Sequence, residues 1–170
     1  MHIRPATPAD ARSIGEVRCT TWRSAYGGLI PQEVLDRLDP EGDVPRFLPV
    51  LTDPDSVFLA AEEEGAVAGF LFGGANRDLT PSPFEGEIYA LYVLPSHQGR
   101  GLGSALLRGF AREWTARGRW SALAWVLEGN PYEGFYPRHG ARELPGREVV
   151  LEGIPLKVKG YGFSDLRKLP

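Results

Sequence analysis

The chain has 170 residues, of which 42% are hydrophobic and 24% charged, and this balance predicts a single globular domain over residues 1–170. A net charge of −3 and a pI near 5.7 exclude the broad basic surface on which nucleic-acid binding depends. No apolar run approaches the roughly 18 residues of a membrane span, and the lone Cys19 cannot form an internal disulfide. Because no apolar targeting segment follows Met1, we expect a cytoplasmic protein without nucleic-acid or membrane partners.

The N-terminal part of the chain predicts a short strand and two helices. Residues 2–5 form the strand, and the Thr7-Pro-Ala-Asp10 sequence then combines a helix cap, a proline at the first helical position and an acid three residues after the cap. Apolar residues recur at helical spacing as far as Tyr26, where a pair of glycines ends the helix. A second helix begins at Pro31.

The middle of the chain predicts a hairpin that follows less regular sequence. The proline-rich segment 39–55 carries a weak helical pattern over about 46–51. Two apolar runs, 57–62 and 66–74, flank Glu63-Glu-Gly65, which suits a hairpin turn.

The C-terminal half alternates strands and helices before it closes with strands alone. The pattern predicts a polar loop over 77–86, a strand over 87–93, a helix over 101–117, an apolar central strand over 120–127, a short helix from Asn130 to about His139, and closing strands over 141–144, 148–152 and 155–163. This order of elements indicates an α+β fold around a mixed sheet.

The most informative segment joins the strand over 87–93 to the helix that follows it. It reads Leu94-Pro-Ser-His-Gln-Gly-Arg-Gly-Leu-Gly-Ser104. A loop of this kind leaves backbone N–H groups unpaired at the positive end of a helix dipole, and glycine lets a ligand approach them closely. The segment therefore predicts an anion site made largely of main chain and suited to a pyrophosphate.

Other glycine-rich phosphate loops fit this segment less well. A dinucleotide-binding fingerprint would follow the first strand of a βαβ unit and carry an acid about 20 residues later, but this loop falls in mid-chain and position 119 is Arg119. A GxxxxGK[ST] loop needs a lysine that is absent here. A glycine-rich turn without any ligand stays open as the simpler alternative.

Two motifs, in this order, resemble the GNAT (GCN5-related) N-acetyltransferase superfamily. Gln98-Gly-Arg-Gly-Leu-Gly103 after Leu91-Tyr-Val-Leu-Pro95 is similar to the acetyl-CoA pyrophosphate loop of that family. Downstream, Asn130 followed by Phe135-Tyr-Pro-Arg-His-Gly140 resembles its late helix and closing F-Y-x-x-x-G motif. The resemblance covers essentially the whole chain. It implies an acyl-CoA N-acyltransferase fold of α+β class, with a mixed, mostly antiparallel sheet of six to seven strands flanked by about four helices.

The resemblance also implies acetyl-CoA as the acyl-donor cosubstrate, and it indicates where this molecule binds. Backbone groups of Leu91, Tyr92 and Val93 would pair with the pantetheine amides as in strand addition, where the family has a bulge that splays this strand from its neighbour. Asn130 would hydrogen-bond the pantetheine arm, cap the helix that follows, or do both. The residues that would hold the pyrophosphate are Gln98, Gly99, Arg100, Gly101, Leu102, Gly103 and Ser104.

Two residues are candidates for the chemistry of acyl transfer, which deprotonates an amine, stabilises an oxyanion and protonates a thiolate. By resemblance, Tyr136 lies beside the thioester sulfur and protonates the leaving thiolate; the alternative is an aromatic packing residue. Glu87 opens an otherwise apolar strand, where partial burial would suit it to act as the general base. The alternative for Glu87 is a solvated carboxylate at the strand end.

By resemblance, the amine acceptor binds between the end of the first helix and the loop over 77–85. Trp22 and Tyr26 would wall an aliphatic or aromatic amine there, and Glu85 would attract its positive charge. Trp22 fits the core equally well. The acceptor is a small-molecule amine or a peptide amine, and no residue distinguishes between the two. Homodimers are common in the family, so a homodimer is a further expectation.

The remaining chemistry-bearing residues form no second site in the sequence pattern. His97 and His139 adjoin the two motifs at positions that the family varies, and both are interpreted as surface residues. No Cys-x-x-Cys or His-x-Glu cluster supports a metal site, so none is expected. Cys19 is expected to be buried and inert.

The sequence thus favours an N-acetyltransferase in which the amine attacks acetyl-CoA directly within a ternary complex. A non-catalytic acyl-CoA-binding regulatory or partner-binding module of the same fold is the alternative, although such a protein need not retain both Glu87 and Tyr136. A nucleotide-binding oxidoreductase, the third hypothesis, would bind NAD instead.

Overall fold

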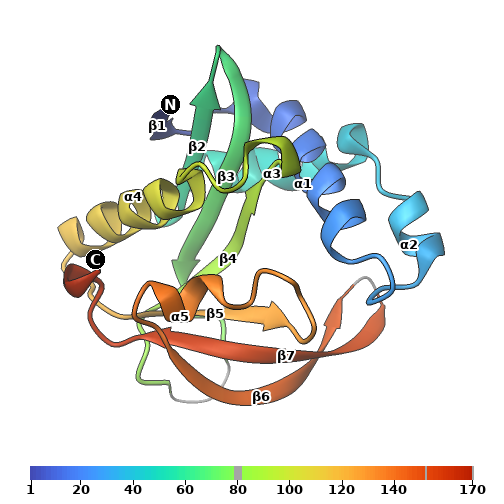
Figure 1. Cartoon of the computed structure of the whole chain (residues 1–170). Coiled ribbons are helices and arrows are strands. Elements are labelled where there is room, and N and C mark those ends of the chain that lie inside the picture. Colours follow the sequence, from blue (N-terminus) through green and yellow to red (C-terminus); the bar gives the residue numbers. More distant parts are fainter. Residues whose placement is uncertain (79–81, 152, 170) are drawn as a thin grey trace.

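The computed structural model describes residues 1–78, 82–151 and 153–169, which form a seven-stranded sheet with helices on both faces (Figure 1). The described strands are β1 (His2–Pro5), β2 (Val57–Glu63), β3 (Ala66–Ala75), β4 (Gly86–Val93), β5 (Ala122–Leu127), β6 (Arg142–Leu151) and β7 (Ile154–Phe163). Their order across the sheet is β1-β2-β3-β4-β5-β7-β6, and each neighbouring pair of described strands is antiparallel except β4–β5. The mixed, mostly antiparallel α+β sheet expected from the sequence is therefore confirmed.

Helices cover this sheet on both faces because its strands alternate their side chains between two apolar clusters. The described α-helices are α1 (Ala11–Ala25), α2 (Gln32–Asp36), α3 (Pro40–Leu51), α4 (Leu102–Ala116) and α5 (Phe135–Arg138). On one face, Ile14 of α1 and Phe47 of α3 pack against Phe58 of β2. On the other face, Phe110 of α4 packs with Leu59, the next residue along β2. No described helix is long and apolar enough to cross a membrane.

The cap predicted at Thr7 is present, and it belongs to a network around Asp10. The backbone N–H of Thr7 donates to Asp10 Oδ2 at 2.8 Å, and a short 3₁₀ turn over Pro8–Asp10 leads into α1. Both Arg4 Nη atoms also donate to the Asp10 carboxylate at 2.8 Å. The Arg4 hydrogen bonds, helped by Thr7, lower the pKa of Asp10 from 3.8 to about 2.

We expect Asp10→Asn to lower the free energy of unfolding by about 2 kcal/mol at pH 7, because a pKa lowered by folding is a stabilising term. The term is fully present above the ordinary carboxyl pKa and is lost as the pH falls through the folded-state pKa. The difference between wild type and variant should therefore shrink between about pH 4 and pH 2. Urea unfolding at several pH values measures it. Asp55→Asn, at an exposed position, is the control. A difference in unfolding free energy between wild type and Asp10→Asn that does not change with pH would contradict the lowered pKa of Asp10.

The segment before β2 differs from its prediction. The sequence predicted a weak helix over about 46–51, whereas α3 runs from Pro40 to Leu51. Asp39 caps it by accepting the N–H groups of Glu41 at 3.2 Å and Gly42 at 3.1 Å. Two internal prolines remove backbone hydrogen bonds, which weakens the local helical signal. Packing of α3 against α1 outweighs that local penalty.

The end of the sheet also differs from its prediction. The two short strands expected over 141–144 and 148–152 are one strand, β6, over its described length, and position 152 lies outside the described residues. Its register against β7 shifts between Leu144 and Arg147, so the Pro145-Gly146 pair sits at an irregularity. A proline is tolerated there because β6 is the last strand of the sheet.

Candidate active site

A gap opens in the sheet where β4 and β5 part. The two strands pair in parallel only as far as Ile88, which lies opposite Ala124. On its other edge, β4 shifts register against β3 so that Tyr89 is an extra residue between two paired positions. An extra residue bends a strand and increases its twist, and this is the bulge expected in β4. Beyond Ile88, the edge of β4 that faces β5 is left without a strand partner.

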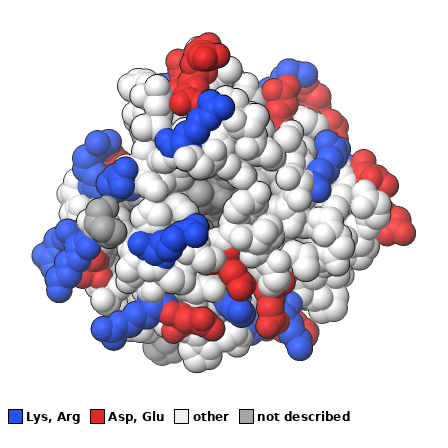
Figure 2. All heavy atoms as spheres, viewed as in Figure 1, with Lys and Arg blue, Asp and Glu red and all other residues white. Residues whose placement is uncertain are grey.

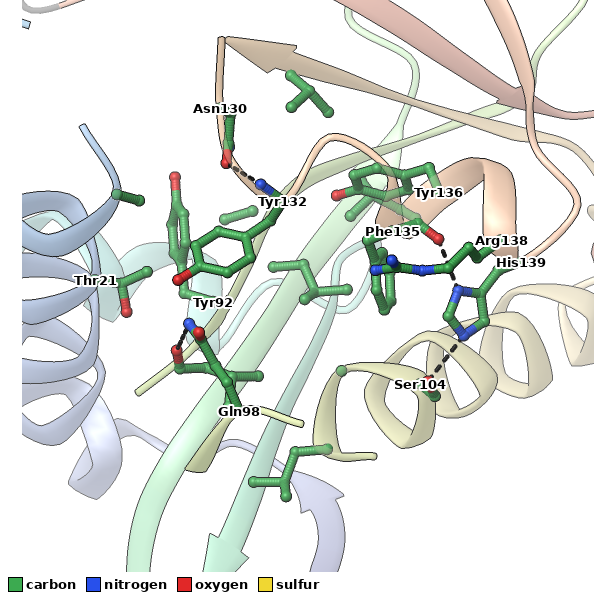
Figure 3. Close-up of a pocket in the computed structure, with 18 of the residues that line it drawn as sticks. Thr21, Tyr92, Gln98, Ser104, Asn130, Tyr132, Phe135, Tyr136, Arg138 and His139 are labelled. Atoms are coloured by element: carbon green, nitrogen blue, oxygen red, sulfur yellow. Dashed lines mark hydrogen bonds between the residues drawn. The ribbon is translucent and has the colours of Figure 1, made fainter. Parts of the chain in front are cut away.

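A cavity of about 590 Å³ lies at this gap. It is lined by β4 and β5, the end of α1, the loop before α4, and the segment that carries α5. Figure 2 shows a hollow near the centre of this face, with most of the charged side chains closer to its edge. Figure 3 shows the side chains that converge on the cavity from these elements.

The glycine loop presents main-chain donors to one end of the cavity. Gly99 and Gly101 both lie in the left-handed region, with φ of +73° and +86°, and both line the cavity. A Cβ at either position would meet no atom within 4 Å, so this space is open. The first amide to bond back in the helix is that of Ala105, to the Gly101 carbonyl at 2.9 Å. The amides of His97 and Gln98 bond back within the loop, at 2.8 Å to the Leu94 carbonyl and 3.4 Å to the Pro95 carbonyl, whereas those from Gly99 to Ser104 have no backbone partner among the described residues.

The expected pyrophosphate residues do not all reach the cavity. Those that line it are Gln98, Gly99, Gly101, Leu102, Gly103 and Ser104. The side chain of Gln98 turns back and donates from Nε2 to the Val93 carbonyl at 2.9 Å, which fastens the loop to the end of β4. Arg100 is not among the lining residues; it is exposed and lies 3.7 Å from Glu63. The strand residues Leu91, Tyr92 and Val93 all line the cavity.

Two residues beside this loop, Arg138 and His139, also line the cavity. His139 Nδ1 lies 2.8 Å from the Phe135 carbonyl, and its Nε2 lies 2.8 Å from Ser104 Oγ. Because a carbonyl only accepts, Nδ1 donates to it, while Nε2 lies within hydrogen-bond distance of the Ser104 hydroxyl (Figure 3). His139 and His97, interpreted from the sequence as surface residues, are both partly exposed and both line the cavity. Arg138 was missed, although it lies two residues after Tyr136 in the same motif.

Tyr136 places its hydroxyl in the cavity (Figure 3). Its ring stacks on that of Tyr161, with centroids 5.7 Å apart, and meets Phe135 edge-on at 5.2 Å. Burial, and to a lesser degree the nearby Tyr92, raise the pKa of Tyr136 above its ordinary value of 10. The phenol therefore keeps its proton through the physiological range. Asn130 also lines the cavity, and its Oδ1 accepts the Tyr132 N–H at 2.9 Å. It caps a turn and not the expected helix from Asn130, because α5 begins only at Phe135, with Gly134 as its N-cap.

Glu87 does not lie with these groups. Only 3% of the residue is exposed, and it is not among the residues that line the cavity. Its carboxylate accepts three hydrogen bonds from Arg77: from the backbone N–H at 3.1 Å, from Nε at 3.2 Å and from Nη2 at 2.5 Å. Glu87 still lies where β4 is paired with β5, so the gap has not yet opened at its position. The structure thus does not bring the expected base to the cavity.

Of the three expected acceptor residues, one lines the cavity. Tyr26 does, and burial raises its pKa. Trp22 is a core residue, which was the alternative considered for it: it is 4% exposed, and its ring meets that of Tyr26 edge-on with centroids 5.2 Å apart. Glu85 lies elsewhere, because its Oε2 accepts the backbone N–H groups of Trp120 at 2.8 Å and Ser121 at 3.2 Å ahead of β5.

Four further lining residues were not predicted from the sequence. Thr21, Tyr89, Trp125 and Tyr132 line the cavity from α1, β4, β5 and the segment after β5. Trp125 sits in an apolar run that reads as a buried strand, so no local signal separates it from the core. Cys19 is buried, and burial raises its pKa. No cluster among the described residues could hold a metal ion.

Comparison with known proteins agrees with this geometry. The model of the acetyltransferase (GNAT) family matches residues 19–141. The chain is 31% identical over 167 residues to the N-acetyltransferase YuaI of Bacillus subtilis, covering 98% of this chain and 95% of the relative. It is 34% identical over 117 residues to an aminoglycoside N(6')-acetyltransferase of Stenotrophomonas maltophilia, covering 66% of each.

Solved structures share the fold. The protein yncA from Salmonella typhimurium, solved with its cofactor acetyl-CoA, superposes with a TM-score of 0.72 at 24% identity, covering 98% of this chain and 94% of that one. PaiA N-acetyltransferase from Thermoplasma acidophilum, in complex with coenzyme A, gives a TM-score of 0.68 at 18% identity over 93% and 96% of the two chains. A family match over most of the chain and a relative that spans nearly all of it leave one conclusion: the chain belongs to the GNAT family and is an acetyl-CoA-dependent N-acetyltransferase.

Proposed function

We propose that this enzyme transfers the acetyl group of acetyl-CoA to a primary amine by direct attack in a ternary complex, with Tyr136 as the general acid. One observation carries the proposal. The free amides of the glycine loop, the unpaired edge of β4 and the hydroxyl of Tyr136 all face one cavity. A molecule with a diphosphate at one end, an amide-bearing arm and a reactive thioester at the other needs these three features in this order.

The residues present fit this cosubstrate. The amides from Gly99 to Ser104 would hold the diphosphate, with Arg138 adding a positive charge beside them. The edge of β4 from Leu91 to Val93 would pair with the amides of the arm, as an added strand does. Asn130, on the far side of the cavity, would contact the same arm.

In this reaction the protein need not form a covalent bond to the acyl group. The bound thioester supplies an already activated acyl group, whose C–S bond is replaced by a C–N bond to the amine. Tyr136 holds a proton at the place where sulfur leaves, and its raised pKa keeps that proton available at neutral pH. The phenol of Tyr136 donates its proton to the departing sulfur, and the proton that the attacking nitrogen loses as the C–N bond forms passes through water to the phenolate, which restores the acid.

The general base is the part of the prediction that the geometry does not support. The Glu87 carboxylate is held by Arg77 outside the cavity lining, and no Asp or Glu is among the described residues that line the cavity. We therefore propose that the amine enters uncharged or loses its proton to water. The rate should then rise with pH along the titration of the amine itself.

The proposal is tested by calorimetric titration with acetyl-CoA, followed by detection of released thiol over a panel of primary amines. Wild type should bind acetyl-CoA and release thiol with at least one amine. Arg138→Gln should weaken acetyl-CoA binding by about fivefold to tenfold at low salt, because a charge beside phosphate contributes a salt-dependent attraction. Arg142→Gln, at an exposed position in β6, is the matched control and should leave binding unchanged.

Three results would speak against the proposal. Absence of heat with any coenzyme A thioester would remove the cosubstrate. Binding without thiol release over a wide amine panel would favour the non-catalytic module. Stabilisation by NAD instead of acetyl-CoA would favour the oxidoreductase.

A further inference from the structure

The acceptor end of the cavity carries aromatic rings where a site for a multiply charged amine would carry carboxylates. Four aromatic residues line the cavity here: Tyr26 just after α1, Tyr89 of β4, Trp125 of β5 and Tyr132 of the segment after β5. Among the described residues, no Asp or Glu joins them in the lining. A ligand with several positive charges would leave water here without a counter-charge, which is costly.

Two of these rings are backed by arginines. The Arg77 guanidinium lies over the ring of Tyr89 at 3.9 Å, and that of Arg147 lies over Trp125 at 3.8 Å. Each arginine is held in place by an acid outside the lining, Glu87 for Arg77 and Asp78 for Arg147. A ring that already has a cation on one face attracts a second cation less well on the other.

Two buried polar atoms in the lining residues lack a partner among the described residues. They are the indole Nε1 of Trp125 and the hydroxyl Oγ1 of Thr21. Thr21 is 4% exposed and projects from α1 on the side of the cavity that holds Tyr92 (Figure 3). An indole N–H is a donor only, so its missing partner is an acceptor such as a carbonyl or carboxylate oxygen. A buried donor without a partner is unfavourable, and a ligand that supplies the oxygen removes that cost.

From these observations we infer that the acceptor is a small amino-acid-like amine. It has one primary amine, an apolar body that packs against the rings, and an oxygen acceptor within a few bonds of the amine. It carries no second positive charge. This inference rests on the proposed acetyl transfer, and it names the substrate class of the same site. Trp125 and Thr21 are the residues that would select the oxygen.

The experiment compares ligands that differ in one feature. L-phenylalanine and L-phenylalaninamide carry the oxygen, 2-phenylethylamine has the same ring and amine without it, phenylalanylglycine presents a peptide amine, and spermidine carries several charges. Each is assayed for acetyl-CoA-dependent thiol release and, separately, titrated by calorimetry into the protein saturated with coenzyme A. We expect one of the two phenylalanine ligands to exceed 2-phenylethylamine and spermidine by about tenfold in kcat/KM and in affinity.

Variants then assign the preference to particular residues. Trp125→Phe keeps an aromatic ring and removes the N–H, and Thr21→Val keeps the shape and removes the hydroxyl. Each should lower the ratio of kcat/KM for the oxygen-bearing ligand to kcat/KM for 2-phenylethylamine from about ten toward one. Trp120→Phe is the matched control, because Trp120 also lies under an arginine, Arg167 at 4.5 Å, but does not line the cavity. It should leave the preference unchanged.

The outcomes separate this inference from the proposed function. Turnover with spermidine as the preferred acceptor would overturn the inference while acetyl transfer stands. Turnover confined to the peptide amine would assign the site to protein N-termini instead. If no amine is turned over, acetyl transfer is in doubt, but the calorimetric comparison still decides the inference: equal affinity for phenylalanine and 2-phenylethylamine would overturn it.

Discussion

Replacing Tyr136 with phenylalanine is expected to lower kcat by about 100-fold or more while the affinity for acetyl-CoA barely changes. The ring would still stack on Tyr161 and meet Phe135 edge-on, so the wall of the cavity would keep its shape. Only the donor to the leaving sulfur would be lost. Steady-state kinetics with a good amine gives kcat, and calorimetry gives the affinity.

Tyr161→Phe is the matched control for this prediction. Tyr161 is the stacking partner of Tyr136 and is buried, but it does not line the cavity, so its hydroxyl should be dispensable for turnover. Unchanged activity in Tyr136→Phe would remove the acid role. An equal loss in both variants would indicate damage to the packing and not a missing proton donor.

The pKa of Tyr136 adds a second check on the same role. Because burial raises it above 10, the acid form persists below that pH and is lost only above it. The pH profile of kcat should therefore show no falling limb from this group below about pH 10. A falling limb near neutral pH that disappears in Tyr136→Phe would contradict the assignment.

Replacing Asp43 with alanine is expected to lower the free energy of unfolding by roughly 3–5 kcal/mol. Arg18 Nη1 of α1 donates to the two Asp43 oxygens of α3 at 2.8 and 3.0 Å, and the two side chains are only 9% and 6% exposed. The guanidinium also lies 4.2 Å from the ring centroid of Trp22. Removing the carboxylate takes away a hydrogen-bonded counter-charge from a buried cation, which is costlier than removing the whole pair.

Urea unfolding of three variants tests this reasoning. The double variant Arg18→Met/Asp43→Leu should recover much of the stability lost in Asp43→Ala, because it removes the buried cation together with its buried counter-charge and fills the space with apolar side chains. Glu16→Ala removes an exposed partner of Arg12 on the same helix and should cost less than about 1 kcal/mol. A similar loss of stability in Glu16→Ala and Asp43→Ala would show that burial does not determine how much an ion pair contributes to the free energy of unfolding.

The sequence was sufficient to predict most of the helices and strands, because the local pattern of each segment agrees with the element that it forms in the fold. Two apolar runs on either side of a Glu-Glu-Gly turn predicted the β2–β3 hairpin. Helical spacing predicted both ends of α4 and the end of α1 within one residue, whereas Pro8, the expected start of the first helix, lies in the 3₁₀ turn before α1. The sequence was insufficient for α3, where two prolines weaken the local pattern and contacts with α1 restore the helix. It also divided β6, because the Pro145-Gly146 pair reads as a break when the neighbouring strand is not known.

Some residues of the candidate site could likewise be predicted from the sequence, whereas others depend on the tertiary structure. The sequence by itself determined the glycine loop and the tyrosine of the late helix as residues of one site, and both line the cavity, because each depends on a short contiguous motif. The tertiary structure alone decided where Glu87 and Glu85 go, since their partners, Arg77 and the amides before β5, come from other segments. It also decided that Trp125 and not Trp22 lines the cavity. Both are large apolar residues in patterned segments, and only the parting of β4 from β5 determines which of them meets a ligand.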